Sequence, residues 1–404
     1  MTRDLLLRDV RPMGGPPVDL LIRDGRIAAP GTPPAPDAAV EQGGGALLLP
    51  GLVEGHTHLD KTLLGMGWRP HQAGPAIIDK IETERRLKRE WGIDPARQSA
   101  RQVAQSVAFG TTAIRSHVDV DDVMGLEAVE GVMETRAAWA DHVSIEVVAF
   151  PQSGIVARPG VAALLEGALR LGADIVGGLD PCAIDRDPKG HLDVVFGLAE
   201  RFGRPVDIHL HEPGALGAFS LELILERAEA LGMQGRVTVS HAFCLGDAEP
   251  ATVSALLERL ARLDVAIATT APASRPVPPV PRLRELGIRV CAGNDGIRDT
   301  WNPYGNGDML ERAMLTGLRW NCRRDEEIAM ALDLCTTGGA AVLGLADYGL
   351  APGCWADLVL VAAESPAEAV VARPPRRLVL RRGRAVARDG VAAGPGGEAA
   401  QPTG

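Results

Sequence analysis

The chain contains little lysine and has no excess of positive charge. Of its 404 residues, 42 are basic and 52 are acidic, so the formal net charge is −10, and only four of the basic residues are lysine. A protein that binds a nucleic acid or an anionic membrane surface usually presents a basic patch to the phosphates. The charge balance argues against both partners and leaves small molecules as the expected ligands.

The sequence also lacks long apolar runs and paired cysteines. No run approaches the roughly 20 residues that a membrane-spanning helix requires, and the first residues do not resemble a signal peptide. None of the six cysteines belongs to a C-x-x-C pair, since the closest two are thirteen residues apart. This spacing excludes zinc ribbons, thioredoxin-like motifs and the small zinc nucleobase deaminases. Scattered cysteines favour reduced thiols and a cytoplasmic location.

Most of the chain alternates between short apolar or β-branched runs and amphipathic helical stretches. The expected strands are residues 46–58, 111–118, 143–150, 175–179, 206–211, 237–242, 265–270 and 289–293. The expected helices include residues 96–109, 126–140, 161–171, 192–202, 221–231 and 251–263. Eight strands that alternate with helices predict an α/β fold of the (β/α)₈ barrel type. A doubly wound open sheet is the alternative, but no G-x-G-x-x-G motif follows a strand.

The two ends of the chain resemble each other and differ from the middle. Short strand-like runs separated by Gly and Pro occur at residues 5–10, 19–22 and 26–28, and again at 357–362, 377–380 and 384–387. We expect residues 1–50 and 346–404 to form one small composite β-sandwich domain. Residues 51–345 would then form the barrel domain.

The first chemical motif lies at the end of the first expected barrel strand. His56 and His58 are two residues apart, so both side chains point to the same side of the strand. Two imidazoles at the carboxyl end of a barrel strand can form half of a metal site. Two polar residues that merely fill a layer of the barrel would give the same pattern.

Three further fragments place polar residues at the ends of expected strands. The fifth strand ends with His209 and Glu212, the sixth ends with His241, and the eighth is followed by Asp295. A single histidine there is usually an ordinary core or surface residue, and Asn-Asp-Gly is most often a turn. The order of the whole set, however, indicates an active site at the carboxyl-terminal face of a barrel.

The order of these residues resembles that of the amidohydrolase superfamily, and more narrowly that of bacterial cytosine deaminases and their triazine-ring relatives. The resemblance covers about residues 51–345. It rests on the strings Arg115-Ser-His117-Val-Asp119, Val148-Ala-Phe-Pro-Gln152, Asp207-Ile-His209-Leu-His211-Glu212, Val237-Thr-Val-Ser240-His241 and Asp299-Thr-Trp301-Asn-Pro303.

The resemblance implies one divalent metal ion, Zn²⁺ or Fe²⁺, held by His56, His58, His209 and Asp295. Three neutral nitrogens and one carboxylate suit both ions. Superfamily members with two metals usually bridge them with a carboxylated lysine on the fourth strand. Residues 175–181 contain no lysine, so a single ion is expected.

The resemblance also implies hydrolytic deamination of a free heterocyclic base, such as cytosine or a 5-substituted pyrimidine. Metal-activated water would attack the ring carbon that bears the amino group. Glu212 would protonate the adjacent ring nitrogen, and His241 would orient the attacking oxygen. Asp295 would pass the proton from the water to the departing ammonia.

Three residues are candidates for substrate binding. Gln152 resembles the residue that reads the base in this family, and Trp301 could close the apolar side of the pocket or belong to the core. Lys61 could bind an anionic or carbonyl-rich ring edge, or form a salt bridge with Asp60 or another rim carboxylate. Gly296 stands where cytosine-specific relatives often have an acidic residue, which would remove bulk and charge beside the ring.

Two other functions remain open. The protein could instead release a substituted amine from a triazine ring, as N-alkylammelide hydrolases do, or cleave a cyclic amide; Lys61 and Gly296 keep this alternative open. A non-catalytic metal-binding scaffold would not need the three candidate catalytic residues together. The subunit number is open and includes a homo-oligomer.

The remaining histidines are not assigned to the metal. His117 and His211 face inward by alternation, without a role as ligands. His71, His142 and His191 are expected to be exposed to solvent.

Overall fold

A computed structural model describes residues 4–395, and one of its two eight-stranded sheets is the barrel that the sequence predicts. Eight strands follow one another in chain order, and every neighbouring pair is parallel. They are β5 (Leu52–Thr57), β6 (Thr111–Asp119), β7 (Ser144–Phe150), β8 (Ile175–Leu179), β9 (Val206–His209), β10 (Val237–Ser240), β11 (Ala266–Thr269) and β12 (Val290–Ala292). The expectation of a (β/α)₈ barrel is therefore confirmed.

The barrel closes where the end of β12 meets β5. The amide of Asp295 donates a hydrogen bond to the carbonyl oxygen of His56 at 2.9 Å, and Thr57 forms a parallel bridge with Asp295. This approach depends on Gly293, because a Cβ atom there would lie 2.4 Å from the carbonyl oxygen of His56. The closure therefore places Asp295, which follows β12, directly beside His56 on β5.

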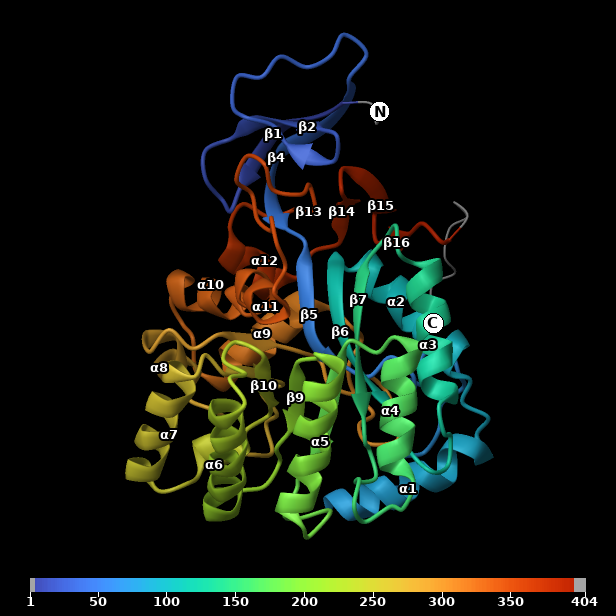
Figure 1. Ribbon diagram of the computed structural model, residues 1–404. Helices are drawn as coiled ribbons and strands as arrows, with labels where there is room; N and C mark the ends of the chain where they lie inside the picture. The colour runs from blue at the N-terminus through green and yellow to red at the C-terminus, as the bar shows by residue number, and fades with distance from the viewer. Residues whose placement is uncertain (1–3, 396–404) are drawn as a thin grey trace.

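Helices surround the barrel (Figure 1). Six of them match the sequence expectation, namely α2 (Pro95–Ala108), α3 (Glu127–Ala138), α4 (Val161–Leu171), α5 (Pro188–Phe202), α6 (Gly214–Ala230) and α7 (Pro250–Arg262). The sequence analysis did not identify α1 (Ile77–Glu90), α8 (Val280–Glu285), α9 (Met309–Arg319), α10 (Asp325–Asp333), α11 (Thr337–Leu343), α12 (Pro366–Ala372) or the short 3₁₀ helix at Phe243–Gly246. In residues 4–395, no helix is both long enough and apolar enough to cross a membrane.

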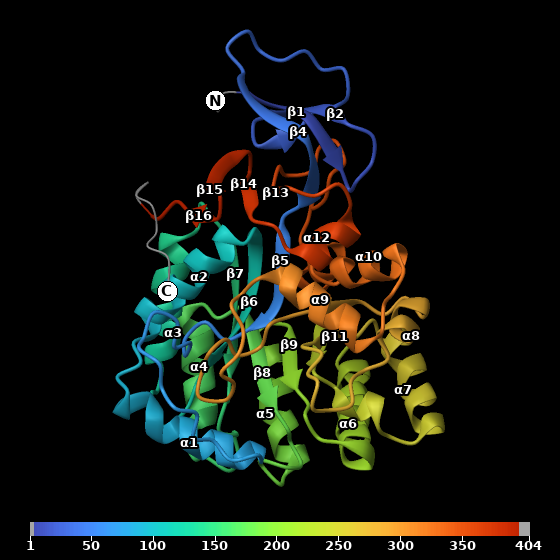
Figure 2. The same cartoon turned by 180° about the vertical axis from the view of Figure 1, so that it is seen from behind.

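The N-terminal and C-terminal strands meet at one end of the molecule (Figures 1 and 2). They form one eight-stranded sheet in the order β16-β15-β14-β13-β4-β1-β2-β3. Its strands are β1 (Leu5–Pro12), β2 (Val18–Arg23), β3 (Arg26–Ile27), β4 (Ala39–Pro50), β13 (Leu358–Val361), β14 (Arg376–Arg381), β15 (Arg384–Arg388) and β16 (Val391–Ala392). The expected association of the two chain ends is confirmed, and residues 396–404 lie outside the described part.

The boundary between the two sheets corrects one expected strand. The run at residues 46–58 is not one barrel strand, because β4 belongs to the terminal sheet and β5 to the barrel. Gly51 lies between them, and its amide donates to the carbonyl of Asp357 at 2.7 Å. A Cβ atom at Gly51 would lie 2.2 Å from the hydroxyl of Thr112, so glycine lets the chain pass close to β6.

The terminal sheet takes part in two hydrophobic cores. Leu47 and Leu49 on β4 pack in the barrel core, whereas Leu48 between them packs in a separate core of the terminal sheet. On β13, Val359 faces the barrel core and Leu358 the terminal core. Because successive side chains of a strand point to opposite faces, these strands join the two cores.

Candidate metal and active site

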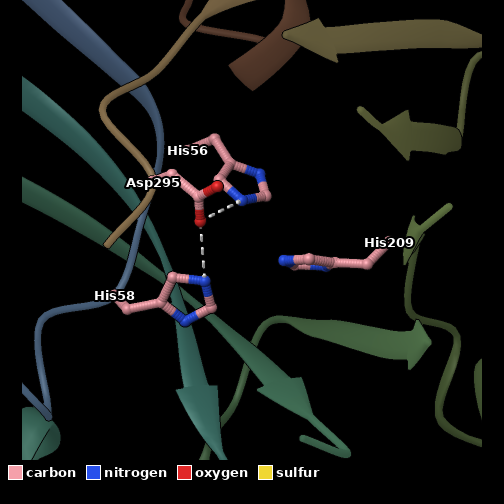
Figure 3. Close-up of side chains that lie close together, drawn as sticks. All are labelled: His56, His58, His209 and Asp295. Carbon is pink, nitrogen blue, oxygen red and sulfur yellow. Dashed lines mark ion pairs between the residues drawn. The ribbon is translucent and has the colours of Figure 1, made fainter. Parts of the chain in front are cut away.

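The four predicted metal ligands converge at the carboxyl ends of the barrel strands. His56 lies on β5 and His58 follows it, His209 is the last residue of β9, and Asp295 follows β12. One donor atom from each of the four lies within 4.8 Å of those of the others. Figure 3 shows the ring of His209 pointing toward the other three side chains across the opening.

Several imidazole nitrogens of this cluster have no hydrogen-bond partner. His58 Nε2 lies 3.3 Å from Asp295 Oδ1, and His56 Nε2 lies 3.7 Å from the same oxygen. Neither ring nitrogen of the buried His209 has a hydrogen-bond partner, and His56 Nε2 has none either. Buried polar atoms without partners are costly unless they bind something. Three such imidazoles beside a carboxylate fit the donor set of a divalent metal site.

The charge states of the cluster also suit a metal. Burial lowers the pKa of His58 to about 4, assisted by the nearby charge of Lys61. Burial and the neighbouring histidines hold the pKa of His209 well below its usual value. Burial opposes ionisation of Asp295, but His241 and the ligand histidines keep its pKa well below the usual value. Neutral imidazoles and an ionised carboxylate are the forms that coordinate metals.

A chain of buried polar groups orients His56. Its Nδ1 lies 2.9 Å from Ser240 Oγ, which donates to Asp207 Oδ1 at 2.7 Å, and Asp207 Oδ2 accepts from Arg115 at 3.2 Å. Because the single serine proton is directed to Asp207, Ser240 Oγ accepts the Nδ1 proton of His56. The lone pair of His56 is thereby placed on Nε2, which faces the cluster. The sequence analysis missed Ser240 and Asp207, although Asp207 shares the inward face of β9 with His209.

His241 adjoins the four ligands without a hydrogen-bond partner. Its Nε2 lies 4.0 Å from Asp295 Oδ2, and neither ring nitrogen is hydrogen-bonded. The φ angles of His241 and Asp295 are 69° and 63°, in the left-handed region that non-glycine residues rarely adopt. The ring of His211 stacks on His241 with centroids 4.3 Å apart and is held by Asp180 through Nδ1 at 2.8 Å. Strained residues of this kind cluster at functional sites.

Glu212 is anchored beside the loop that follows β8. One carboxylate oxygen accepts hydrogen bonds from the amides of Cys182 and Ala183 at 2.8 and 2.6 Å, and the other accepts from the hydroxyl of Ser220. Burial raises the pKa of Glu212. None of these hydrogen bonds joins Glu212 to the four-residue cluster, so its catalytic role stays a prediction.

Lys61 lies in a buried charge network. Its Nζ is 3.1 Å from Asp119 and 3.2 Å from Glu84, and it donates to Oε1 of Gln152 at 2.5 Å. The salt bridge considered as the alternative for Lys61 is therefore present, with Asp119 and Glu84 rather than Asp60. Since an ammonium group has three protons, these three neighbours can use all of them. Lys61 thus fixes the carbonyl end of Gln152.

Trp301 lies next to this network and also belongs to an apolar cluster. It packs against a cluster that contains Ile81, Phe150 and Leu179, and its ring centroid is 5.8 Å from Lys61 Nζ. Phe150 in turn stacks on His209, with ring centroids 4.1 Å apart. An apolar wall therefore runs from Trp301 to one of the metal ligands.

Two histidines outside the cluster differ from the expected exposure to solvent. His142 is half-buried, and its Nδ1 is buried without a hydrogen-bond partner. His191 on α5 is fully buried rather than exposed, and its Nδ1 lies 2.7 Å from Asp185. Its Nε2 accepts a hydrogen bond from the amide of Leu179 at 3.2 Å. His191 therefore supports the end of β8 and the loop that follows it.

The barrel and its ligand cluster define a hydrolase of the metal-dependent amidohydrolase type. The model of the Amidohydrolase family matches residues 43–391, and the chain belongs to this family.

Similar proteins include enzymes named for N-isopropylammelide and for 5-methylcytosine. The crystal structure of N-isopropylammelide isopropylaminohydrolase from Burkholderia multivorans ATCC 17616 is 52% identical, with a TM-score of 0.93, over 96% of this chain and 99% of that one. N-isopropylammelide isopropyl amidohydrolase from Pseudomonas sp. (strain ADP) is 33% identical over 86% of this chain and 87% of its own length. The 5-methylcytosine deaminase of Klebsiella pneumoniae, solved with 5-fluorocytosine, is 28% identical with a TM-score of 0.82, over 95% of this chain and 97% of that one.

Proposed function

We propose that the protein hydrolyses the bond between a six-membered nitrogen heterocycle and an amino substituent, with an N-alkylated aminotriazine such as N-isopropylammelide as its favoured substrate. The observation that carries the proposal is the buried cluster of three histidines and one aspartate, in which His56 Nε2 and both ring nitrogens of His209 have no hydrogen-bond partner. The choice of ring rests on the 52% identical relative. This choice reverses the order of the two enzyme functions that the motifs favoured.

His56, His58, His209 and Asp295 would hold the metal. When bound there, a divalent ion supplies Lewis-acid activation of water at neutral pH. The reaction consumes one water, replaces the amino substituent with an oxygen and releases the free amine. Asp295 Oδ2, which faces His241, would accept a proton from the water and deliver it to the departing amine nitrogen.

Gln152 and Glu212 would act on the ring itself. Because Lys61 holds the carbonyl oxygen of Gln152, the amide NH₂ is the part that can donate to a ring oxygen or nitrogen. Glu212 would protonate a ring nitrogen next to the carbon under attack. Its raised pKa favours the protonated form that such a step requires.

Deamination of a 5-substituted pyrimidine is the second candidate function. The 28% identical 5-methylcytosine deaminase supports it, because that relative covers nearly the whole chain with a similar fold. In that reaction the leaving group would be ammonia rather than an alkylamine. The same residues would take the same roles.

A substrate panel distinguishes the two functions. Metal-loaded protein would be incubated separately with N-isopropylammelide, ammelide, isocytosine, cytosine and 5-methylcytosine, and both isopropylamine and ammonia would be quantified. We expect the highest kcat/KM for release of isopropylamine from N-isopropylammelide. Preferential release of ammonia from 5-methylcytosine would favour the second candidate, and no release from any compound would overturn the proposal.

A further inference from the structure

Gly296, directly after the ligand Asp295, has no room for a side chain. A Cβ atom there would lie 1.9 Å from Oδ2 of Asp299 and 2.7 Å from its Cγ. Gly296 does not have a positive φ angle, so its backbone conformation alone does not require glycine. What excludes a side chain at Gly296 is the carboxylate of Asp299.

The carboxylate of Asp299 has one fixed oxygen and one without a partner. Oδ1 accepts hydrogen bonds from the amides of Trp301 and Asn302, both at 2.8 Å. The amide of Asp299 also donates to the carbonyl of Asn302 at 2.9 Å, which closes the turn. The side chain is 2% exposed, and within residues 4–395 no hydrogen bond reaches Oδ2. The turn therefore orients a carboxylate whose second oxygen is available to a ligand.

Asp299 also belongs electrostatically to the active site. Burial raises the pKa of Asp299, whereas the charge of Lys61 lowers it and the charge of Asp295 raises it, so both charges act on Asp299. Lys61 fixes Gln152, and the indole of Trp301, two residues after Asp299, lies beside Lys61. The turn of Asp299 therefore lies on the side of the site where Lys61 holds Gln152.

We propose that Asp299 is a specificity-determining residue that accepts a hydrogen bond from an N–H group of the bound ring. This inference rests on the proposed function. It also corrects the expectation that Gly296 removes both bulk and charge beside the ring. The glycine removes the bulk, but the carboxylate of Asp299 occupies the space and restores the charge.

The proposal specifies the ring edge that the site recognises. Gln152 offers a donor through its NH₂ group, and Asp299 offers an acceptor through Oδ2. A ring that carries a carbonyl oxygen and an N–H group, as oxo-triazines and oxo-pyrimidines do, supplies the complementary pair. A ring without any N–H group would leave the buried carboxylate unpaired, which costs affinity.

Asp299→Asn tests the free oxygen while leaving the turn intact. Asparagine retains a carbonyl oxygen that can accept from the backbone amides of Trp301 and Asn302, and it replaces Oδ2 with an NH₂ donor. The opposite orientation of the side-chain amide is disfavoured, because its NH₂ group would then face these two N–H donors. We expect unchanged metal content and melting temperature, and a KM for N-isopropylammelide that rises by about one to two orders of magnitude with a smaller change in kcat. The matched control is Asp94→Asn, which alters a carboxylate that caps α2 and should leave KM unchanged.

A double-mutant cycle tests whether a side chain at position 296 and the carboxylate of Asp299 compete for the same space. Gly296→Ala should raise KM in the wild-type background, because the new methyl group displaces the carboxylate. The same substitution should have little effect when Asp299→Ala has already vacated the space, so the two effects should not add. In Gly296→Asp combined with Asp299→Ala, a carboxylate returns to the same place and should recover part of the lost affinity.

The outcomes separate this inference from the proposed function. An active wild-type protein whose KM is unchanged by Asp299→Asn, or in which the effects of Gly296→Ala and Asp299→Ala simply add, would overturn the inference alone. Lost metal or a lowered melting temperature in Asp299→Asn would also overturn it, because the carboxylate would then serve only the loop. A wild-type protein without turnover on the whole panel would overturn the proposed function and this inference with it.

Discussion

Individual side chains of the site are held in place by hydrogen bonds to the residues behind them. His56 is oriented by Ser240, and Gln152 is oriented by Lys61. These supporting groups are buried, so the geometry that they impose is protected from exchange with solvent. Each of these two side chains is therefore fixed by a buried partner.

Ser240→Ala should weaken metal binding without removing a ligand. Alanine cannot accept the Nδ1 proton of His56, so the tautomer with a free Nε2 is no longer enforced. We expect the dissociation constant of the bound metal to rise about 10–100-fold, measured by competition with a chromogenic chelator. Ser254→Ala, which changes a serine on α7 that bonds only to a backbone carbonyl, should bind metal as the wild type does. Equal affinities in the two variants would contradict the role of Ser240.

The convergence of the four clustered residues could be predicted from the sequence, whereas their supports could not. His56 and His58 follow from the period of two in a strand, and the resemblance supplied His209 and Asp295. Ser240 and Asp299 lie within strings that carry the resemblance, but the sequence does not indicate that the hydroxyl of Ser240 lies at His56 or that Oδ2 of Asp299 has no partner. The partners of Lys61 were likewise unknown, since two of them lie on α1 and β6.

At the scale of elements, α1 shows why a helix beside the site was missed. Its buried residues are Ile81, Glu84, Leu87 and Lys88, so half of its buried face is charged. Hydrophobic periodicity, the main sequence signal of a helix, is therefore weak. Lys88 instead pairs with Glu84 at 3.1 Å and with Asp121 at 2.8 Å. The helix is held to the barrel by a polar network.

Glu84 on α1 should make stability depend on pH. Burial raises the pKa of Glu84 to about 8 despite the opposing charges of Lys61 and Lys88. The folded protein then binds more protons than the unfolded chain, so this contribution is complete below the unfolded pKa of about 4.5 and is lost as pH rises through about 8. The Glu84→Gln variant has no titratable group at this position. Its free energy of unfolding should therefore fall less than that of the wild type, by at least about 1 kcal/mol, between about pH 6 and about pH 9.

Urea denaturation of both proteins at the two pH values gives the required comparison. Glu90→Gln on the same helix is the matched control, because the side chain of Glu90 is 55% exposed and pairs only with Arg86. It should retain the pH dependence of the wild type. An equal change in the free energy of unfolding between the two pH values in all three proteins would show that Glu84 is ionised in the folded state throughout this range.

At the scale of the whole molecule, Arg376 joins the terminal sheet to the barrel. This residue of β14 is buried, forms an ion pair with Asp308 at the start of α9, and donates to the carbonyl of Phe109 at 3.0 Å. Arg376→Ala would leave Asp308 buried without its partner, which typically costs about 3–5 kcal/mol. Arg388→Ala in the neighbouring strand removes an exposed pair with Glu41 and should cost about 0–1 kcal/mol.

Because the two cores share strands, both variants should unfold in a single transition. Tryptophan fluorescence and far-ultraviolet circular dichroism, followed in denaturant, should give the same midpoint. Separate transitions for the sheet and the barrel, or equal losses in the two variants, would contradict this coupling.

The overall architecture was largely predictable, because eight buried strands and two similar chain ends leave few alternatives. The division of residues 46–58 into β4 and β5 was not. The segments on either side of Gly51, residues 46–50 and 52–53, are both apolar, so composition carries no sign of the change of sheet. The boundary is set by pairing with β13, at the other end of the sequence.

That pairing has a consequence for synthesis on the ribosome. β4 is hydrogen-bonded to β1 on one side and to β13 on the other, and Pro50 is opposite Leu358. A nascent chain presents β4 before the barrel strands but its second partner, β13, only after all of them. Until then an apolar strand edge is open to other chains, which is a known route to aggregation. Prematurely terminated products that lack β13 should therefore accumulate as insoluble material or be cleared by proteolysis.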